Sequence, residues 1–101
     1  MEKNLEINIS QDGKIIKFNP RYVSAFGLLS SKPQEVIIFL GLRKPRVFNY
    51  FLDYDLDLFF LDLNLNVVEQ HLLKKWRTYR PVIAAMWVLE VPIIKQDEVK
   101  L

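Results

Sequence analysis

The stretch "YDLDLFFLDLNLNVVEQHLL", residues 54–73, predicts a β-hairpin at the centre of the fold. Its first half repeats every two residues, which is typical of a strand with two different faces. One face carries Tyr54, Leu56, Leu58 and Phe60. The other begins with Asp53, Asp55 and Asp57 and turns apolar at Phe59 and Leu61. "DLN" then predicts a turn, and "LNVVEQHLL" the returning strand.

Strand patterns also occur on both sides of this hairpin. "LEINIS" alternates apolar and polar residues, and Asp12-Gly13 predicts a tight turn into "IIKF". "EVIIFLGL" is apolar on both faces, which is typical of a central strand. "VIAAMWVLEV" predicts a further strand that ends at Pro92. The sequence therefore predicts a mostly β fold.

One segment predicts a helix. Asn19-Pro20 is typical of a helix start, because asparagine can cap the first turn and proline fits its first position. The apolar residues that follow at helical spacing are Tyr22, Val23, Phe26 and Leu29. We therefore expect an α+β chain: a compact small barrel or strongly bent antiparallel sheet with one short helix near residues 20–29.

Composition limits the classes of function. The 101 residues predict one domain, residues 1–101, and half of them are hydrophobic. The chain has no cysteine, which excludes disulfides, zinc–thiolate sites and cysteine catalysis. No run approaches the roughly 18 apolar residues of a membrane span. We expect a cytoplasmic protein without a membrane partner and without a cofactor.

The candidate metal and catalytic residues each have a simpler interpretation. Asp62, Asn64 and Asn66 begin like a calcium loop, but Val67 and Leu73 occupy the positions that need glycine and a carboxylate. A polar hairpin turn fits better. The row of aspartates at 53, 55 and 57 suits a hard cation or acid–base work, but also an exposed strand face, which we favour.

The sequence also has no motif of a catalytic nucleophile and none of a phosphate-transfer enzyme. His71 is the single histidine, and none of the serines has the surroundings of a nucleophile. No glycine-rich phosphate loop occurs in the chain. We therefore expect no catalytic residue and no metal ligand, and predict that the protein is not an enzyme.

Two basic clusters provide candidate phosphate contacts: Arg43, Lys44, Arg46, Lys74 and Lys75. The second cluster lies in the segment "KKWRTYRP", residues 74–81, which has four cations and no acid. Aromatic residues between cations can stack on bases. Alternatively, Trp76 and Tyr79 anchor the loop inward while the cations stay in water, which we favour.

The run from residue 56 to 92 resembles the second half of the DUF192 domain, also called UPF0127, a small prokaryotic family of uncharacterised biochemical function. The shared elements are Leu56, Asp57, Val67, Val68, residues 76–81, Ala84, Leu89, Glu90 and Pro92. The resemblance implies that the basic motif follows the family's fold. Its structural residues are then Trp76, Arg77, Tyr79, Arg80 and Pro81.

The first half departs from the family pattern. The family's polar signature, Trp-Met-Lys-Asn-Thr, falls on "FNYFL", residues 48–52, where aromatic and apolar residues replace the polar ones. An apolar patch in place of a polar one is expected when a surface becomes an interface. We therefore predict a protein interface at Phe48, Tyr50 and Phe51.

These observations lead to two functional hypotheses. The first is a non-catalytic interaction domain, a small accessory subunit of a larger assembly, with a larger protein as partner. Its basic loops favour a nucleic-acid-processing, polymerase-type assembly, with weak and non-specific nucleic-acid contact. The alternative is a small-ligand-binding barrel that keeps the family's cleft.

Overall fold

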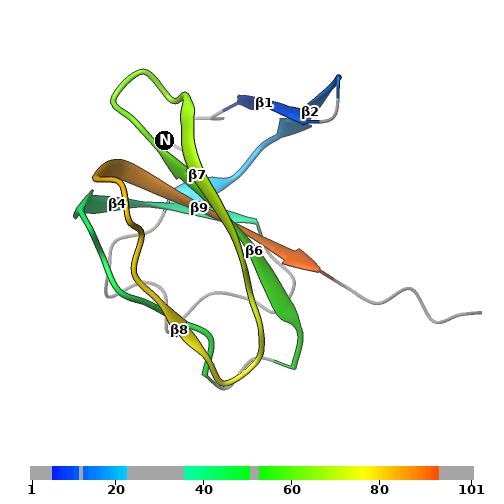
Figure 1. Cartoon of the computed structure of the whole chain (residues 1–101). Helices are drawn as coiled ribbons and strands as arrows, with labels where there is room; N and C mark the ends of the chain where they lie inside the picture. The colour runs from blue at the N-terminus through cyan, green and yellow to red at the C-terminus, as the bar shows by residue number, and fades with distance from the viewer. Residues whose placement is uncertain (1–5, 12, 23–35, 51–52, 94–101) are drawn as a thin grey trace, which may run out of the picture.

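The computed structural model describes residues 6–11, 13–22, 36–50 and 53–93 (Figure 1). In these ranges it contains the strands β1 (Ile7–Gln11), β2 (Lys14–Phe18), β3 (Arg21–Tyr22), β4 (Ile37–Arg43), β5 (Val47–Phe48), β6 (Asp55–Leu61), β7 (Val67–Leu73), β8 (Thr78–Tyr79) and β9 (Ala85–Ile93). The mostly β prediction is confirmed. Since the described residues form no helix, none of them lies in a helix long and apolar enough to cross a membrane.

The main sheet has five strands in the order β3-β4-β9-β6-β7. The short β3 is parallel to β4, whereas the other neighbours are antiparallel. Two smaller sheets pair β1 with β2 and β5 with β8. Among the described strands β3 and β7 form open edges, so the expected barrel is not closed and the sheet is mixed, not purely antiparallel.

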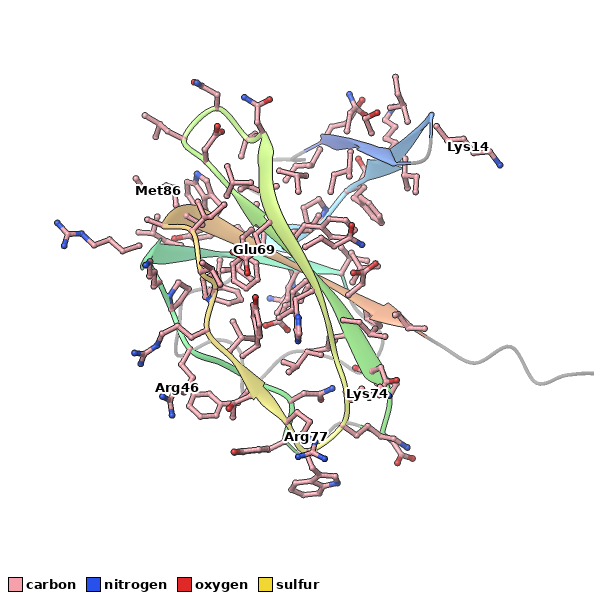
Figure 2. The ribbon with its side chains drawn as sticks, in the orientation of Figure 1. Lys14, Arg46, Glu69, Lys74, Arg77 and Met86 are labelled. Carbon is pink, nitrogen blue, oxygen red and sulfur yellow. The ribbon has the colours of Figure 1, made fainter. Side chains whose placement is uncertain are left out.

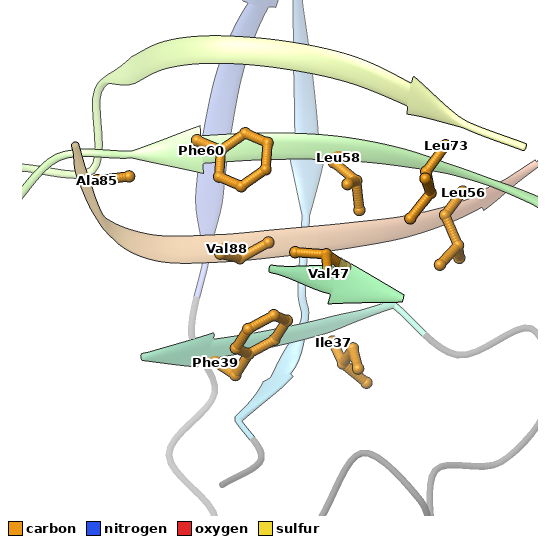
Figure 3. Close-up of a cluster of buried hydrophobic side chains, with 9 residues drawn as sticks. All are labelled: Ile37, Phe39, Val47, Leu56, Leu58, Phe60, Leu73, Ala85 and Val88. Atoms are coloured by element: carbon orange, nitrogen blue, oxygen red, sulfur yellow. The ribbon is translucent and has the colours of Figure 1, made fainter. Parts of the chain in front are cut away.

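The predicted central hairpin is confirmed as β6 and β7. Leu56 pairs with Leu73 at one end and Phe60 with Glu69 at the other, after which a bulge shifts the register. The two-residue period also separates the faces as expected. Leu58 and Phe60 enter one core (Figure 3), and Phe59 enters the other. Both faces of β6 are therefore covered.

The two cores lie on opposite faces of the main sheet. The first core includes Val47 from β5 and has Tyr79 from β8 packed against it. The second core includes Ile7 and Ile9 from β1, with Phe18 from β2 packed against it. The β1–β2 hairpin thus covers one face and the β5–β8 pair the other. The alternation in "LEINIS" is satisfied because its isoleucines are the buried positions.

The expected helix near residues 20–29 is not supported. Arg21 and Tyr22 form β3, and Arg21 donates its backbone N–H to the carbonyl of Val36 at 3.0 Å. Pairing with β4 satisfies backbone groups that a first helical turn would leave without partners. Tertiary pairing thus overrides the local Asn19-Pro20 signal. Residues 23–29 of the expected helix lie outside the described residues.

Candidate functional site

Three exposed rings form a row at one end of the molecule, which we name the aromatic row: Phe48, Tyr50 and Trp76. Their side chains are 54%, 40% and 62% exposed, respectively. The ring centroids of Phe48 and Tyr50 are 5.5 Å apart, and those of Tyr50 and Trp76 are 6.0 Å apart with an interplanar angle of 25°. Each ring therefore contacts the next while a large part of it faces solvent.

Backbone hydrogen bonds hold the two segments of the aromatic row together. Phe48 pairs with Thr78 in the β5–β8 sheet. One residue further along, Asn49 donates its N–H to the carbonyl of Arg77 at 2.9 Å, and Trp76 donates its N–H to the carbonyl of Asn49 at 2.6 Å. The row therefore rests on a paired backbone, which fixes how the rings are presented.

A tight turn projects Trp76 from this pair of segments. The N–H of Arg77 bonds the carbonyl of Lys74 at 3.2 Å, and Trp76 has a φ of 62°. A non-glycine residue rarely adopts this left-handed conformation. Because the surrounding bonds hold that backbone, the ring points outward, which differs from the inward anchor expected from the sequence.

The buried side chain of Asn49 ties the backbone of the aromatic row to neighbouring strands. Its side chain is 0% exposed, and its Nδ2 donates to the carbonyls of Tyr54 at 3.0 Å and Leu73 at 3.1 Å. These bonds connect β5 to the start of β6 and the end of β7. Sequence reasoning missed Asn49, although an amide between two aromatic residues of an extended segment is a signal for a buried polar anchor.

Exposed cations lie at the same end of the molecule as the aromatic row. Figure 2 shows Arg46, Lys74 and Arg77 at the same end of the molecule, with Lys14 at the opposite end. All five candidate phosphate contacts are exposed, and within the described residues none of them forms an ion pair. Phe48 and Tyr50 of the predicted interface thus lie at the end of the molecule that carries Arg46, Lys74 and Arg77, whereas Phe51 lies outside the described residues.

Tyr79 packs against the core, whereas Trp76 is exposed to solvent. Its ring packs 5.9 Å from Phe60 in the first core and stacks on His71, with centroids 3.6 Å apart and an interplanar angle of 8°. Its hydroxyl donates to Glu69 Oε2. Tyr79 therefore joins β8 to β7 and to the core.

Glu69 completes this connection by binding the loop after Pro81. Its Oε1 accepts the N–H groups of Val82 at 2.9 Å and Ile83 at 3.0 Å. Burial alone would raise the pKa of this carboxyl, but the bonds from Tyr79 and the two amides, with nearby His71, hold its pKa below the ordinary value. We assign Glu69 a structural role because ordinary backbone groups use its lone pairs.

Three relatives cover most of the chain. A UPF0127 protein of Pyrococcus furiosus is 33% identical over 95 residues, which cover 85% of this chain and 81% of the relative. One from Pyrococcus horikoshii is 29% identical over 97 residues, covering 92% and 84%. One from Pyrococcus abyssi is 29% identical over 90 residues, covering 85% and 77%. This chain belongs to the UPF0127 family. No family model and no solved structure matches it.

The UPF0127 relatives carry the family name alone, which assigns no substrate or partner. In this UPF0127 protein the described part of residues 48–52 supplies Phe48 and Tyr50 to the aromatic row and Asn49 to its support.

The Leu-Glu-hydrophobic-Pro element of this UPF0127 chain lies in β9. Glu90 pairs with Leu58 on one side and Ile37 on the other, and it is 7% exposed. Burial raises its pKa to about 7. Sequence reasoning missed this group, although a lone acid within the apolar run "VIAAMWVLEV" is a signal for a buried carboxyl.

The acidic candidates of the UPF0127 chain have structural partners. Asp62 Oδ1 accepts the N–H groups of Asn64 and Asn66, both at 2.9 Å, which makes the predicted polar turn. Asp55 accepts the N–H of Lys75 at 3.1 Å. Asp57 accepts the amide of Gln70, and burial raises its pKa. Within the described ranges no cluster of acids and histidines could hold a metal.

An open depression of about 390 Å³ lies elsewhere on the molecule. Its lining consists of Arg43, Asp62, Leu63, Ala84, Ala85 and Met86. The charged residues there are Arg43 and Asp62, and the Asp62 carboxylate already binds its own turn. The aromatic row therefore remains the better candidate for function.

Proposed function

We propose that this UPF0127 protein is a non-catalytic interaction domain, a small accessory subunit that binds a larger protein through the aromatic row. The observation that carries this proposal is the contact between three exposed rings, flanked by exposed cations, at one end of the fold. Scattered exposed apolar residues are ordinary on a protein surface, but a contiguous group marks an interaction site.

The physical chemistry of interfaces supports this assignment. Burying apolar surface contributes about 25 cal/mol per Å², and aromatic side chains provide much of it with few rotatable bonds. The paired backbone beneath the rings already fixes their positions, which reduces the entropy lost on binding. Cations around an apolar centre resemble the polar rim of a protein interface.

The engagement of the candidate acids also supports a non-catalytic role. Asp55, Asp62 and Glu69 accept backbone N–H groups, and Asp57 accepts the Gln70 amide. Groups held in this way stabilise the fold. A nucleic-acid-processing assembly remains part of the proposal because the exposed cations suit a partner that carries phosphates.

The test is affinity capture from native lysate followed by mass spectrometry. The Tyr50→Ala/Trp76→Ala double variant removes two exposed rings, so its melting temperature should stay close to that of the wild type. We expect the wild type to retain a large protein at stoichiometric yield, and the double variant to lose it.

The matched control is Ile15→Ala, because Ile15 is 76% exposed on β2, next to Lys14 at the opposite end of the molecule. This variant should retain the partner. Equal capture by the wild type, the double variant and the control would exclude the aromatic row as the binding surface.

A further inference from the structure

Among the strands that the structure describes, β7 forms an open edge of the main sheet. It has seven residues, Val67–Leu73, and pairs with β6 on one side. In the described part of the sheet no strand follows it on the other side. Figure 3 shows the strand that carries Leu73 next to the strand that carries Leu58 and Phe60.

This edge has little of the usual protection against pairing. Natural edge strands carry lysine or proline, or are very short. β7 contains neither residue, and its sequence "VVEQHLL" has one acid and one histidine. A bulge interrupts the register only near its start. Since alternate residues of an antiparallel strand direct N–H and C=O away from the existing partner, β7 presents a row of donors and acceptors.

The sequence of this edge is complementary to itself. If two copies of β7 lie antiparallel with Gln70 opposite Gln70 of the second copy, Glu69 of each faces His71 of the other. Glu69 and His71 share the face of β7 that carries Leu73, since they alternate with Gln70. Such a cross-strand carboxylate–imidazole pair is favourable, whereas equal charges would repel.

Aliphatic residues flank this polar centre on both sides. They are Val67 and Val68 before it and Leu72 and Leu73 after it. In the register centred on Gln70, the valines of one copy lie beside the leucines of the other, and the bulge near the start of β7 offsets them from direct cross-strand pairs. Leu72 is 46% exposed and Val67 is 39% exposed in the single chain, so pairing would cover apolar surface as well as backbone groups.

We propose that two copies of this chain pair through antiparallel β7 strands in the register centred on Gln70. The two five-stranded sheets then become one continuous sheet. This pairing goes beyond the proposed function, because it uses an edge of the sheet and leaves the aromatic rows uncovered. Since each row follows the end of β7, the antiparallel dimer presents its two rows at opposite ends and can bind two partners at once.

The existing contacts of Glu69 are compatible with this dimer. Its side chain lies on the face of β7 that carries Leu73, where it bonds Tyr79 and the loop at residues 82–83. They hold the carboxylate in a fixed position, which lowers the entropy lost when the edge pairs.

The absence of cysteine from the chain permits a direct test of the register. In this register the Cα atoms of Gln70 and its symmetry mate are about 4.5 to 5.5 Å apart, within disulfide range. The Gln70→Cys variant should therefore form a covalent dimer under mild oxidation. Leu72→Cys is the matched control, because residue 72 and its mate are offset by four positions, about 13 Å.

A second measurement does not depend on Gln70, whose amide also bonds Asp57. The mass of the wild type is measured by sedimentation over a range of concentrations, and we expect a dimer. Leu72→Lys places a charge on the exposed edge and should weaken dimerisation at least about tenfold. Leu63→Lys, at a 71% exposed position in the turn before β7, should leave it unchanged.

The outcomes separate the proposal from its alternatives. Cross-linking at residue 70 but not at 72, with a dimer that Leu72→Lys disrupts, supports the proposed register. A monomer at every concentration overturns it. Equal cross-linking at both positions overturns it too, as does a dimer that Leu72→Lys leaves intact, since pairing would then occur elsewhere.

Discussion

Trp76 and Tyr79 belong to one sequence motif but have different environments. Tyr79 packs against the first core and bonds Glu69, whereas Trp76 is 62% exposed. We expect Tyr79→Ala to lower the free energy of unfolding by about 3 kcal/mol, because it removes a partly buried ring packed on the core together with its hydrogen bond. Trp76→Ala should cost less than about 1 kcal/mol, as is usual for surface positions. Chemical denaturation of both variants measures the difference.

Tyr79→Phe is the control that separates packing from hydrogen bonding. It keeps the ring against Phe60 and His71 but removes the bond to Glu69, so we expect a loss of about 1 to 2 kcal/mol. If Trp76→Ala costs as much as Tyr79→Ala, the tryptophan is a structural anchor after all and the aromatic row is not available for binding.

Glu90 should make the stability of the protein depend on pH. Its pKa is about 7 in the folded state, raised by burial from an ordinary value of 4.5. The folded state therefore binds more protons than the unfolded state between these values. The contribution of Glu90 to stability is fully present below pH 4.5 and is lost as the pH rises to about 7.

The Glu90→Gln variant should remove this dependence. A shift of this size corresponds to about 3 kcal/mol, so at pH 8 the variant should exceed the wild type in free energy of unfolding by up to that amount. Below pH 4.5 the two should be similar. Denaturant titrations from pH 4 to 8 measure the difference, and a constant offset across this range would contradict the raised pKa.

At the scale of the element, β4 depends on a close approach at Gly41. A Cβ at this position would lie 2.9 Å from Cγ2 of Val88 and 3.0 Å from Cγ of Pro45. Gly41→Ala should therefore destabilise the protein by about 1 to 3 kcal/mol through overpacking. Adding Val88→Ala should offset part of this cost, because the second change removes the methyl group that the new Cβ contacts.

Gly13 provides the matched comparison in another element. It lies in the β1–β2 turn with a φ of 73°, and no atom lies within 4 Å of an added Cβ. Gly13→Ala should cost about 1 kcal/mol through backbone strain alone. Its effect should add to that of Val88→Ala, whereas the Gly41 pair should not be additive. Additivity in both double variants would argue against the close contact at Gly41.

At the scale of the whole molecule, the exposed cations predict weak, salt-dependent contact with nucleic acid. Arg46, Lys74 and Arg77 share one end of the fold. Five phosphate contacts by the candidate cations would give a slope of about −4 to −5 for log K against log salt concentration on duplex DNA. Fluorescence anisotropy from low to physiological salt measures this slope for the isolated domain.

Charge reversal tests whether the two basic clusters act together. Lys44→Glu and Lys74→Glu should each weaken binding at low salt and reduce the slope, whereas Lys14→Glu, at the opposite end, should have less effect. Absence of binding at low salt, or binding that neither reversal changes, would remove nucleic acid from the proposal and leave a protein partner alone.

The sequence by itself determined the strands whose signals are local. In residues 54–73 a two-residue period coincides with turn residues, and β6 and β7 follow the predicted alternation. The period was sufficient because both faces of β6 are buried, so a shift of one residue would exchange its two sets of side chains between the two cores. The polar turn at Asp62 was predictable for the same reason, since its bonds stay within five residues.

The tertiary structure alone decided the features that depend on distant segments. Arg21 forms a strand because Val36 supplies a backbone partner, which the Asn19-Pro20 signal does not reveal. Trp76 points outward because its N–H bonds the carbonyl of Asn49, 27 positions earlier in the sequence. The physical reason is the same in both cases: backbone groups need partners, and periodicity does not show which remote carbonyl will satisfy them.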